Sequence, residues 1–215
     1  MSEPVQKAAK TKRPRGRPRA YEPDVALRRA TQAFWRDGFA GTSLDALTDA
    51  MDMNRPSLYG AFGDKRDLYL AALDRYADVS RAQMRELLAN QPTLAKALQA
   101  VYDGSLALYF ADASSPLGCF LIGTAATEAA RDESVKDKLG GALREFTKAF
   151  KARIVRARDE GEISDDADPA LLADLASAVL FSIALRARAG DSRASLRAFS
   201  RSAVAFVCGA ARNRH

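Results

Sequence analysis

Apolar residues recur three or four positions apart through most of this chain, and this spacing constrains the fold more than any other feature. One stretch places them at Leu139, Leu143, Phe146, Phe150 and Ile154, so that all five lie on one face of a helix. No convincing run alternates apolar and polar residues as a half-buried strand does. The sequence therefore predicts an all-α protein of about nine helices.

The first part of this pattern consists of three short helices and one long helix. We expect them at about residues 23–38, 43–53, 54–62 and 65–89. The second helix starts at residues 42–45, which look like a capping box, and Asn54 is a good N-cap for the third. This order is typical of a helix-turn-helix module followed by a connecting helix.

Two runs in this region resemble a known family. Residues 34–44 (FWRDGFAGTSL) and 54–65 (NRPSLYGAFGDK) are similar to the N-terminal DNA-binding domain of TetR-family transcriptional regulators. The resemblance implies a sequence-specific DNA-binding regulator, most often a repressor that a small-molecule effector releases from a palindromic operator. It also implies a DNA-binding domain at 21–81 with its motif at about 44–63, and an effector-binding and dimerisation domain at 82–215. Composition adds a disordered basic arm at residues 1–20.

Two positions depart from the family pattern. The turn carries Asp52 where members often have glycine, and aspartate tolerates the left-handed conformation less well than glycine but better than most residues. After Tyr59 stand Gly60 and Ala61, where the family often has histidine or a bulky aromatic residue. Base recognition therefore has to depend on Arg55, Ser57 and close backbone approach.

The residues expected to contact DNA fall into three groups. Arg55 is the best candidate for a base edge, with Ser57 assisting, because arginine can donate two hydrogen bonds to guanine. The candidates for phosphate contact or close approach are Thr42, Ser43, Pro56, Tyr59, Gly60 and Lys65. The third group is Arg15, Arg17 and Arg19 in the arm.

The positive charge of the chain is concentrated in the arm. Residues 1–20 hold seven basic residues and one acidic residue, which accounts for the whole formal net charge of +6. The segment 15–19 resembles the Gly-Arg-Pro core of AT-hook peptides, whose arginines enter an A·T-rich minor groove. A solvated tail that makes nonspecific phosphate contacts is the alternative.

The last two predicted helices combine alanine and serine with large apolar residues. In the family these helices pair with their twins at a two-fold axis, and residues 169–211 fit that role. An ordinary intramolecular core is the alternative. A two-fold operator requires two DNA-binding units, so we expect a homodimer.

Aromatic and large apolar residues gather in the middle of the C-terminal region. The candidate effector pocket consists of Tyr102, Leu106, Tyr109, Phe110, Cys119, Phe120, Phe146, Phe150 and Phe181. In the family such a pocket holds a small molecule. The scarcity of internal histidine and cysteine weighs against a metal ion and favours a hydrophobic or amphipathic molecule. Cys119 follows Pro116 in a first helical turn, which favours the thiolate of a redox or electrophile sensor, whereas its neighbours Leu117 and Phe120 favour an inert packing thiol.

Composition weighs against several other classes of protein. The one histidine is His215 and the two cysteines lie far apart, so a histidine triad or a Cys/His metal site is not expected, and neither is a cofactor. The longest uncharged run, 113–127, contains a proline and is too short to span a membrane. No apolar stretch follows the basic N-terminus, so we expect a cytoplasmic protein rather than a secreted one. Two rivals remain: a sequence-tolerant architectural DNA-binding protein without an effector, and a helical enzyme that uses carboxylates.

Overall fold

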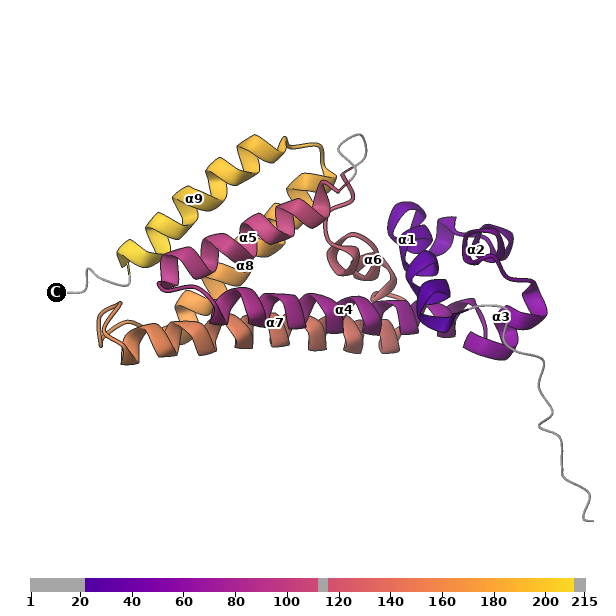
Figure 1. Cartoon of the computed structure of the whole chain (residues 1–215), viewed down its shortest axis with the longest axis horizontal. Helices are drawn as coiled ribbons and strands as arrows, with labels where there is room; N and C mark the ends of the chain where they lie inside the picture. The colour runs from indigo at the N-terminus through magenta and orange to yellow at the C-terminus, as the bar shows by residue number, and fades with distance from the viewer. Residues whose placement is uncertain (1–21, 112–115, 211–215) are drawn as a thin grey trace, which may run out of the picture.

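Nine α-helices and one π-helical turn make up the residues that the computed structural model describes, 22–111 and 116–210 (Figure 1). The fold is all-α, as predicted. The helices are α1 (Pro23–Gly41), α2 (Leu44–Met51), α3 (Arg55–Phe62), α4 (Lys65–Ala89), α5 (Leu94–Tyr109), α6 (Ala126–Glu128), α7 (Glu133–Asp159), α8 (Pro169–Arg188) and α9 (Arg193–Ala210). The π-helical turn spans Leu121–Ala125, directly before α6.

Helices α1, α2, α3 and the start of α4 form a small unit at one end of the molecule, which we call the head (Figure 1). Its core contains Phe34, Leu47, Met51, Leu58 and Leu68, each at most 1% exposed. Helices of eight residues, such as α2 and α3, are unstable in isolation. Packing on this shared core therefore holds them in place.

Helix α1 is broken at Gly38, whose φ of 74° and ψ of 172° are not helical. The sequence predicted that the helix ends here, and the structure adds one further turn, to Gly41. The hydroxyl of Thr42 donates a hydrogen bond of 2.6 Å to the carbonyl oxygen of Gly38. This bond satisfies a backbone group that the break would otherwise leave without a partner.

The remaining helices form a second unit, the body, and α4 runs from the head into it. Helix α4 packs on α7, and the two long helices lie along one side of the molecule in Figure 1. Helix α8 packs on α5, α7 and α9, and α5 also contacts α9. The π-helical turn contacts α1 as well as α4, α7 and α8, so it lies where the head meets the body.

The π-helical turn differs from the ordinary helix that the sequence predicted after Pro116. Within it, the hydroxyl of Thr124 donates to the carbonyl oxygen of Phe120 at 2.8 Å and also bonds with the hydroxyl of Tyr69 in α4 at 3.0 Å. A widened turn of five residues leaves no distinct apolar period in the sequence. Contacts with other helices, which the sequence does not display, fix its shape.

Helix α8 is long and apolar enough to cross a membrane by length and composition alone, contrary to the sequence-based expectation that no segment meets this test. In the fold, α8 packs against three other helices and buries eight residues, including Leu172, Leu180 and Ile183. A core helix that also has an exposed apolar side meets the same criterion.

Candidate functional site

Helices α2 and α3 form a helix-turn-helix whose turn lies at Asp52. Asp52 adopts the left-handed conformation, with φ 54° and ψ 50°, as the sequence required of this residue. Each helix has a side-chain N-cap: Ser43 accepts from the backbone of α2 at 3.0 Å, and Asn54 accepts from the backbone of α3 at 2.9 Å. These caps fix where each helix begins.

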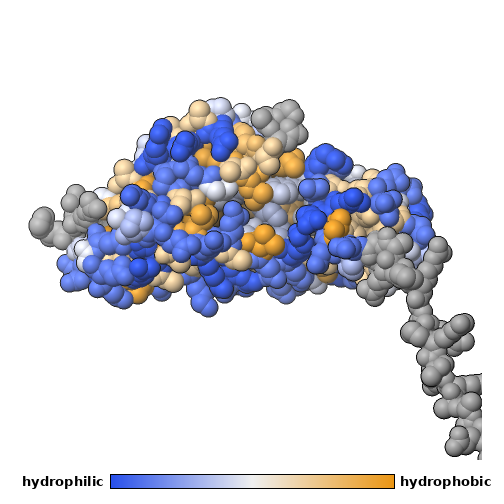
Figure 2. All heavy atoms as spheres, viewed as in Figure 1, coloured by the Kyte–Doolittle hydropathy of each residue, from blue (hydrophilic) through white to orange (hydrophobic). Residues whose placement is uncertain are grey.

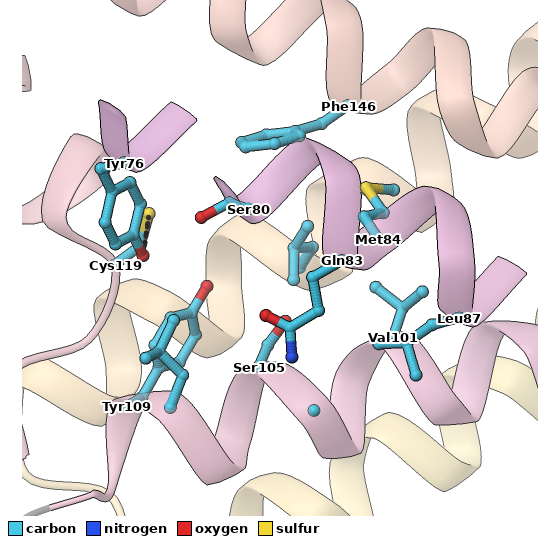
Figure 3. A pocket seen from close by; sticks show the side chains of 13 residues that line it. Tyr76, Ser80, Gln83, Met84, Leu87, Val101, Ser105, Tyr109, Cys119 and Phe146 are labelled. Atoms are coloured by element: carbon cyan, nitrogen blue, oxygen red, sulfur yellow. Dashed lines mark hydrogen bonds between the residues drawn. The ribbon is translucent and has the colours of Figure 1, made fainter. Parts of the chain in front are cut away.

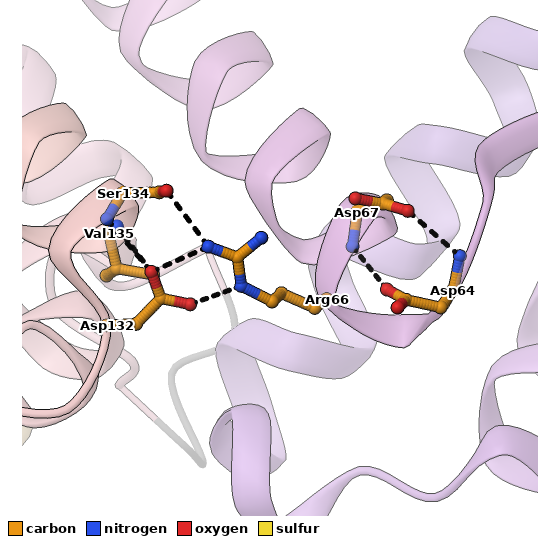
Figure 4. Close-up of polar contacts among 6 residues, drawn as sticks. All are labelled: Asp64, Arg66, Asp67, Asp132, Ser134 and Val135. Carbon is orange, nitrogen blue, oxygen red and sulfur yellow. Dashed lines mark hydrogen bonds and ion pairs between the residues drawn. The ribbon is translucent and has the colours of Figure 1, made fainter.

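A reciprocal capping box is present at the start of α4, not at the start of α2 as predicted. Asp64 accepts from the backbone of Asp67 at 2.9 Å, and the side chain of Asp67 accepts from the backbone of Asp64 at 3.2 Å (Figure 4). The third residue of α2 is Ala46, whose side chain cannot accept a hydrogen bond. Ser43 therefore caps α2 without a returning bond.

One face of α3 is open to solvent and carries most of the predicted contact residues. Arg55, Pro56, Tyr59 and Gly60 are exposed and Ser57 is half-buried, whereas Leu58 anchors the opposite face in the core. A methyl group added at Gly60 would meet no atom within 4 Å. No side chain projects from this face at Gly60, so another molecule can approach the backbone of α3 closely there.

Arg55 is held by an acidic partner that the sequence reasoning missed. Its Nε and Nη2 both donate to Oδ1 of Asp45 in α2, at 3.2 and 2.7 Å. The hydrogen bonds to Asp45 raise the pKa of the Arg55 guanidinium above its ordinary value. Both side chains are largely exposed, so the pair is weak, and it positions Arg55 on the surface while leaving it free to exchange partners. No local signal links residues ten apart on two different helices.

The other candidate phosphate contacts are placed differently from one another. Lys65, the first residue of α4, holds its Nζ 4.5 Å from the ring centroid of Phe39, and Ser43 is exposed at the start of α2. Thr42 is 1% exposed and its hydroxyl is engaged with Gly38. Of these three side chains, Thr42 alone is turned inward.

Charge is distributed unevenly between the arm and the head. Residues 22–67 contain eight acidic and six basic residues, whereas the first twenty residues carry the excess of positive charge. Arg15, Arg17 and Arg19 lie outside the residues that the structure describes. The formal charge of residues 22–67 therefore gives no long-range attraction for DNA phosphates.

A cavity of about 40 Å³ lies in the body between α4, α5 and α7 (Figure 3). Three of the predicted pocket residues line it: Tyr109, Cys119 and Phe146. The polar residues that line it, Tyr76, Ser80, Gln83 and Ser105 among them, were not predicted. Serine and glutamine in a helix usually indicate a solvent-exposed face, so the sequence offered no signal for them.

The other six predicted pocket residues do not line this cavity. Tyr102 packs on Phe150, with 6.2 Å between ring centroids, and donates its hydroxyl to the carbonyl oxygen of Ala176 at 3.0 Å. The remaining four pack in or against the hydrophobic core: Leu106, Phe110, Phe120 and Phe181. An apolar residue at helical spacing is a core residue first, and the sequence does not say which core side chains border a space.

Cys119 is buried between two tyrosines, Tyr76 and Tyr109. The hydroxyl of Tyr76 donates to Cys119 Sγ at 3.5 Å (Figure 3). Burial raises the pKa of the Cys119 thiol above its ordinary value, and burial likewise raises the pKa of both tyrosines well above theirs. Of the two opposed effects expected at Cys119, desolvation is therefore the stronger, and the thiol is neutral at pH 7.

Several polar contacts join the head to the body, and two of these links use arginine side chains. Arg66, near the start of α4, donates through Nη2 to Asp132 Oδ1 and Ser134 Oγ, both at 2.9 Å, at the start of α7 (Figure 4). In the second link, Nη1 of Arg188 in α8 donates to the carbonyl oxygens of Trp35 at 3.3 Å and Leu117 at 3.1 Å. These contacts tie the orientation of the head to α7 and α8.

Helices α8 and α9 present apolar side chains to solvent. Leu171, Leu175, Leu185 and Phe206 are 36% to 67% exposed. A shallow groove between the two helices includes Leu175, Val179, Phe199 and Phe206. In contrast, the surface view is mostly hydrophilic along the side formed by α4 and α7 (Figure 2). An apolar face of this kind marks an interaction surface.

Comparison with known proteins agrees with both parts of this structure. Residues 26–72 match the family model "Bacterial regulatory proteins, tetR family", and residues 79–203 match "Tetracyclin repressor-like, C-terminal domain". The chain is 29% identical over 181 residues to the HTH-type transcriptional repressor ComR of Escherichia coli (strain K12), covering 84% of this chain and 86% of ComR.

A solved structure extends the likeness to three dimensions. It is a cysteine mutant of the TetR family transcriptional regulator CifR complexed with 26bp double-strand operator DNA. CifR is 34% identical to this chain, with a TM-score of 0.80 and coverage of 87% of this chain and 98% of CifR. Reduced NemR from E. coli shares the fold at 20% identity, with a TM-score of 0.72 and coverage of 86% and 94%.

Proposed function

Because the chain belongs to the TetR family of transcriptional regulators, we propose that it is a homodimeric repressor that a small-molecule effector releases from a palindromic operator. The exposed face of α3, held by the turn at Asp52 and the cap at Asn54, is the observation that carries this proposal. Repression is favoured by the match to ComR along most of both chains. The activator FasR of Mycolicibacterium smegmatis matches over 78 residues, 34% of this chain.

The roles at the DNA follow from the placement of the side chains. Arg55 reads a base edge with help from Ser57, while Pro56, Tyr59 and Gly60 allow the backbone of α3 to approach the groove. Ser43 and Lys65 contact phosphates at the starts of α2 and α4, where the helix N-termini add to the attraction. Thr42 contributes through its backbone, and Arg15, Arg17 and Arg19 enter the adjacent minor groove.

Dimerisation uses the apolar face of α8 and α9, within residues 169–211. The groove beside Leu175 and Phe206 is shallow and apolar, as a two-fold helical interface requires. Two α3 helices related by this axis then enter successive major grooves about 34–36 Å apart. Residues 21–81 bind DNA, and residues 82–215 bind the effector and form the dimer. The boundary between the two domains lies inside α4.

The effector site is the cavity beside Tyr76 and Cys119. Its volume of about 40 Å³ has room for a few water molecules, since each needs roughly 10–15 Å³. A larger effector must therefore enlarge the cavity by moving α4 relative to α5 and α7. Because α4 continues into the head, a ligand that favours the enlarged state lowers operator affinity by reciprocal linkage.

The chemistry of the lining defines the effector class. The cavity is lined by apolar and hydroxyl-bearing side chains, together with the amide of Gln83 and the thiol of Cys119. No group of three His, Cys, Asp or Glu residues suited to a metal occurs within the described ranges. A hydrophobic or amphipathic molecule therefore fits best. The site of action is the cytoplasm, where the operator DNA would be.

Fluorescence anisotropy over a salt series tests the proposal. The full chain, and the chain without residues 1–20, are titrated with DNA from upstream of the coding region against scrambled competitor. Preference for one site by roughly a factor of 10³ or more, retained without the arm, supports an operator-specific regulator. Sequence-independent binding that disappears with the arm contradicts it and favours an architectural DNA-binding protein.

A further inference from the structure

A second hollow lies on the surface of the body, between the C-terminal half of α4 and α7. This α4–α7 groove has a volume of about 350 Å³. Its lining consists of Arg85, Leu88, Ala89, Lys148, Ala149, Ala152, Arg153 and Arg156. Four of these residues are cations, four are apolar, and none is acidic. The groove shares no lining residue with the cavity beside Cys119.

Arg153 is the unusual member of this lining because its charge is buried. Its side chain is 3% exposed, and Nη2 donates to Glu162 Oε1 at 2.7 Å. Its Nε and Nη1 have no hydrogen-bond partner. Among the described residues, no other buried side-chain nitrogen or oxygen atom lacks one. Buried N–H donors are costly when they have no acceptor, so these two groups call for one.

Both carboxylate oxygens of Glu162, the acidic partner of Arg153, are already engaged. The other oxygen of Glu162, Oε2, accepts from the backbone nitrogen of Leu94 at 2.5 Å, at the start of α5. Glu162 therefore joins Arg153 to α5 and leaves the Nε and Nη1 of Arg153 to another acceptor.

The remaining three cations form the rim of the groove, and their acidic partners lie outside its lining. Arg85 and Lys148 share Glu145, at 3.2 and 3.8 Å, and Arg156 pairs with Glu160 at 2.8 Å. All three cations are well exposed, so these ion pairs are weak and easily exchanged. The rim can therefore turn its charge toward an anion in the groove.

We infer that the α4–α7 groove is a binding site for a small amphipathic anion, namely a carboxylate with a short aliphatic chain. The carboxylate pairs with the exposed rim cations, and the buried positive charge of Arg153 beside them adds to the attraction. The chain lies along Leu88 and the three alanines. Water would satisfy the N–H groups of Arg153, but it would gain nothing from the apolar floor or from the excess of cations. The volume is at the lower end of the range for small-molecule sites. This inference does not depend on the proposed function.

Calorimetric titration of the full chain with sodium octanoate tests the inference. Octanol carries the same chain without the charge, and inorganic phosphate carries charge without a chain. We expect octanoate to bind at least tenfold more tightly than either. Absence of octanoate binding, as expected if water alone meets Arg153, overturns the inference, and so does equal binding of octanol.

Variants locate the site. Arg85→Gln with Arg156→Gln removes rim charge, and Ala152→Leu places a bulky side chain in the groove. Both leave the Arg153–Glu162 pair intact. Each should weaken octanoate binding at least tenfold. The matched control is Arg81→Gln with Arg144→Gln, which removes two charges from the same helices but in the neighbouring groove, and it should bind as the parent does. Binding that survives both site variants would place octanoate elsewhere and contradict the assignment.

Discussion

The ring of Tyr76 packs edge-on against the indole of Trp35, with 5.2 Å between the ring centroids and 79° between the planes. Tyr76 belongs to α4 and lines the cavity, whereas Trp35 belongs to α1 in the head. The hydroxyl of Tyr76 meets Cys119 on the other side. One aromatic ring therefore contacts both the proposed effector site and the first helix of the DNA-binding unit.

A double-mutant cycle measures how strongly this contact couples the two parts. Trp35→Ala and Tyr76→Ala should each destabilise the protein. The double variant should lose about 1 kcal/mol less than the sum of the two single losses, because an aromatic pair contributes roughly that much beyond the burial of its rings. Urea denaturation of the three variants gives the value. Phe150, whose ring packs on Tyr102, provides the control. The destabilising effects of Trp35→Ala and Phe150→Ala should add. A coupling energy of about 1 kcal/mol in this control pair as well would show that the cycle measures a general loss of stability rather than the Trp35–Tyr76 contact.

Arg55 and Lys65 should fail in different ways when each is replaced by alanine. Arg55→Ala should lose about 1–3 kcal/mol of discrimination between operator and scrambled DNA, since a base contact is removed. Lys65→Ala should weaken binding to all sequences alike and lower the slope of log affinity against log salt by about 1. Anisotropy titrations on both DNAs separate the two. Equal loss of discrimination in both variants would refute this division of roles.

Gly60→Ala should stabilise the protein and weaken its binding to the operator. The added methyl group meets no protein atom within 4 Å, and alanine in a helix is about 0.5–1 kcal/mol more favourable than glycine. The same methyl group would obstruct close approach of DNA to α3. Gly141→Ala on α7 is the control, because a methyl group added there also meets no atom within 4 Å. Its melting temperature should rise as much as that of Gly60→Ala, while its operator affinity stays unchanged. Undiminished operator affinity in Gly60→Ala would exclude close approach at this position.

The Arg66–Asp132 link should contribute stability that depends on pH. Hydrogen bonds from Arg66 lower the pKa of Asp132 to about 2, below its ordinary 3.8. A carboxyl group with a lowered folded-state pKa stabilises the fold above its unfolded-state pKa, and this contribution disappears as the pH falls to about 2. Asp132→Asn keeps a cap for α7 but removes the charge. It should therefore be less stable than the parent at pH 7 and equal to it near pH 2.

Urea denaturation of parent and Asp132→Asn between pH 2 and 7 measures this difference. Added salt should reduce it, because both side chains are accessible to solvent. A difference that stays constant over the whole pH range would mean that the substitution acts through packing or capping rather than charge.

Charged residues on the outer face of α8 and α9 should separate the proposed dimer. Leu185→Lys and Phe206→Glu replace side chains that are 59% and 67% exposed, so the isolated chain should still fold. Size-exclusion chromatography with light scattering should then report a monomer, with operator affinity strongly reduced because two heads are needed. Val79→Glu changes an exposed apolar residue of α4 and should leave the dimer intact. A monomeric parent protein at micromolar concentration would remove the dimer proposal.

Local signals explain which elements could be predicted from the sequence. Helix α4 begins at Lys65 and ends at Ala89, as expected, because a cap precedes it and its apolar residues keep a regular spacing. Helix α8 begins at Pro169, the expected start of the segment 169–211, and Asp168 caps it. In both cases the information lies within a few residues of the boundary.

Tertiary contacts explain what could not be predicted. Arg55 finds Asp45 on another helix, and Thr42 turns inward because α1 breaks at Gly38. Among the aromatic residues, Phe146 borders the cavity while Phe120 packs beside Trp35 and Tyr76. The sequence shows that such residues are buried, but which of them faces a space depends on how the helices are set against each other.

Helix α4 runs without a break from the head into the body, so its helical register fixes the rotation of the head relative to the body. Each residue in an α-helix turns the chain by about 100° and advances it by about 1.5 Å. Insertion or deletion of one residue between Leu73 and Met84 would therefore rotate the head about the axis of α4 and pull Arg66 away from Asp132. Surface loops tolerate changes in length, but this junction does not, so recombination between relatives can exchange heads only where the helical register is kept.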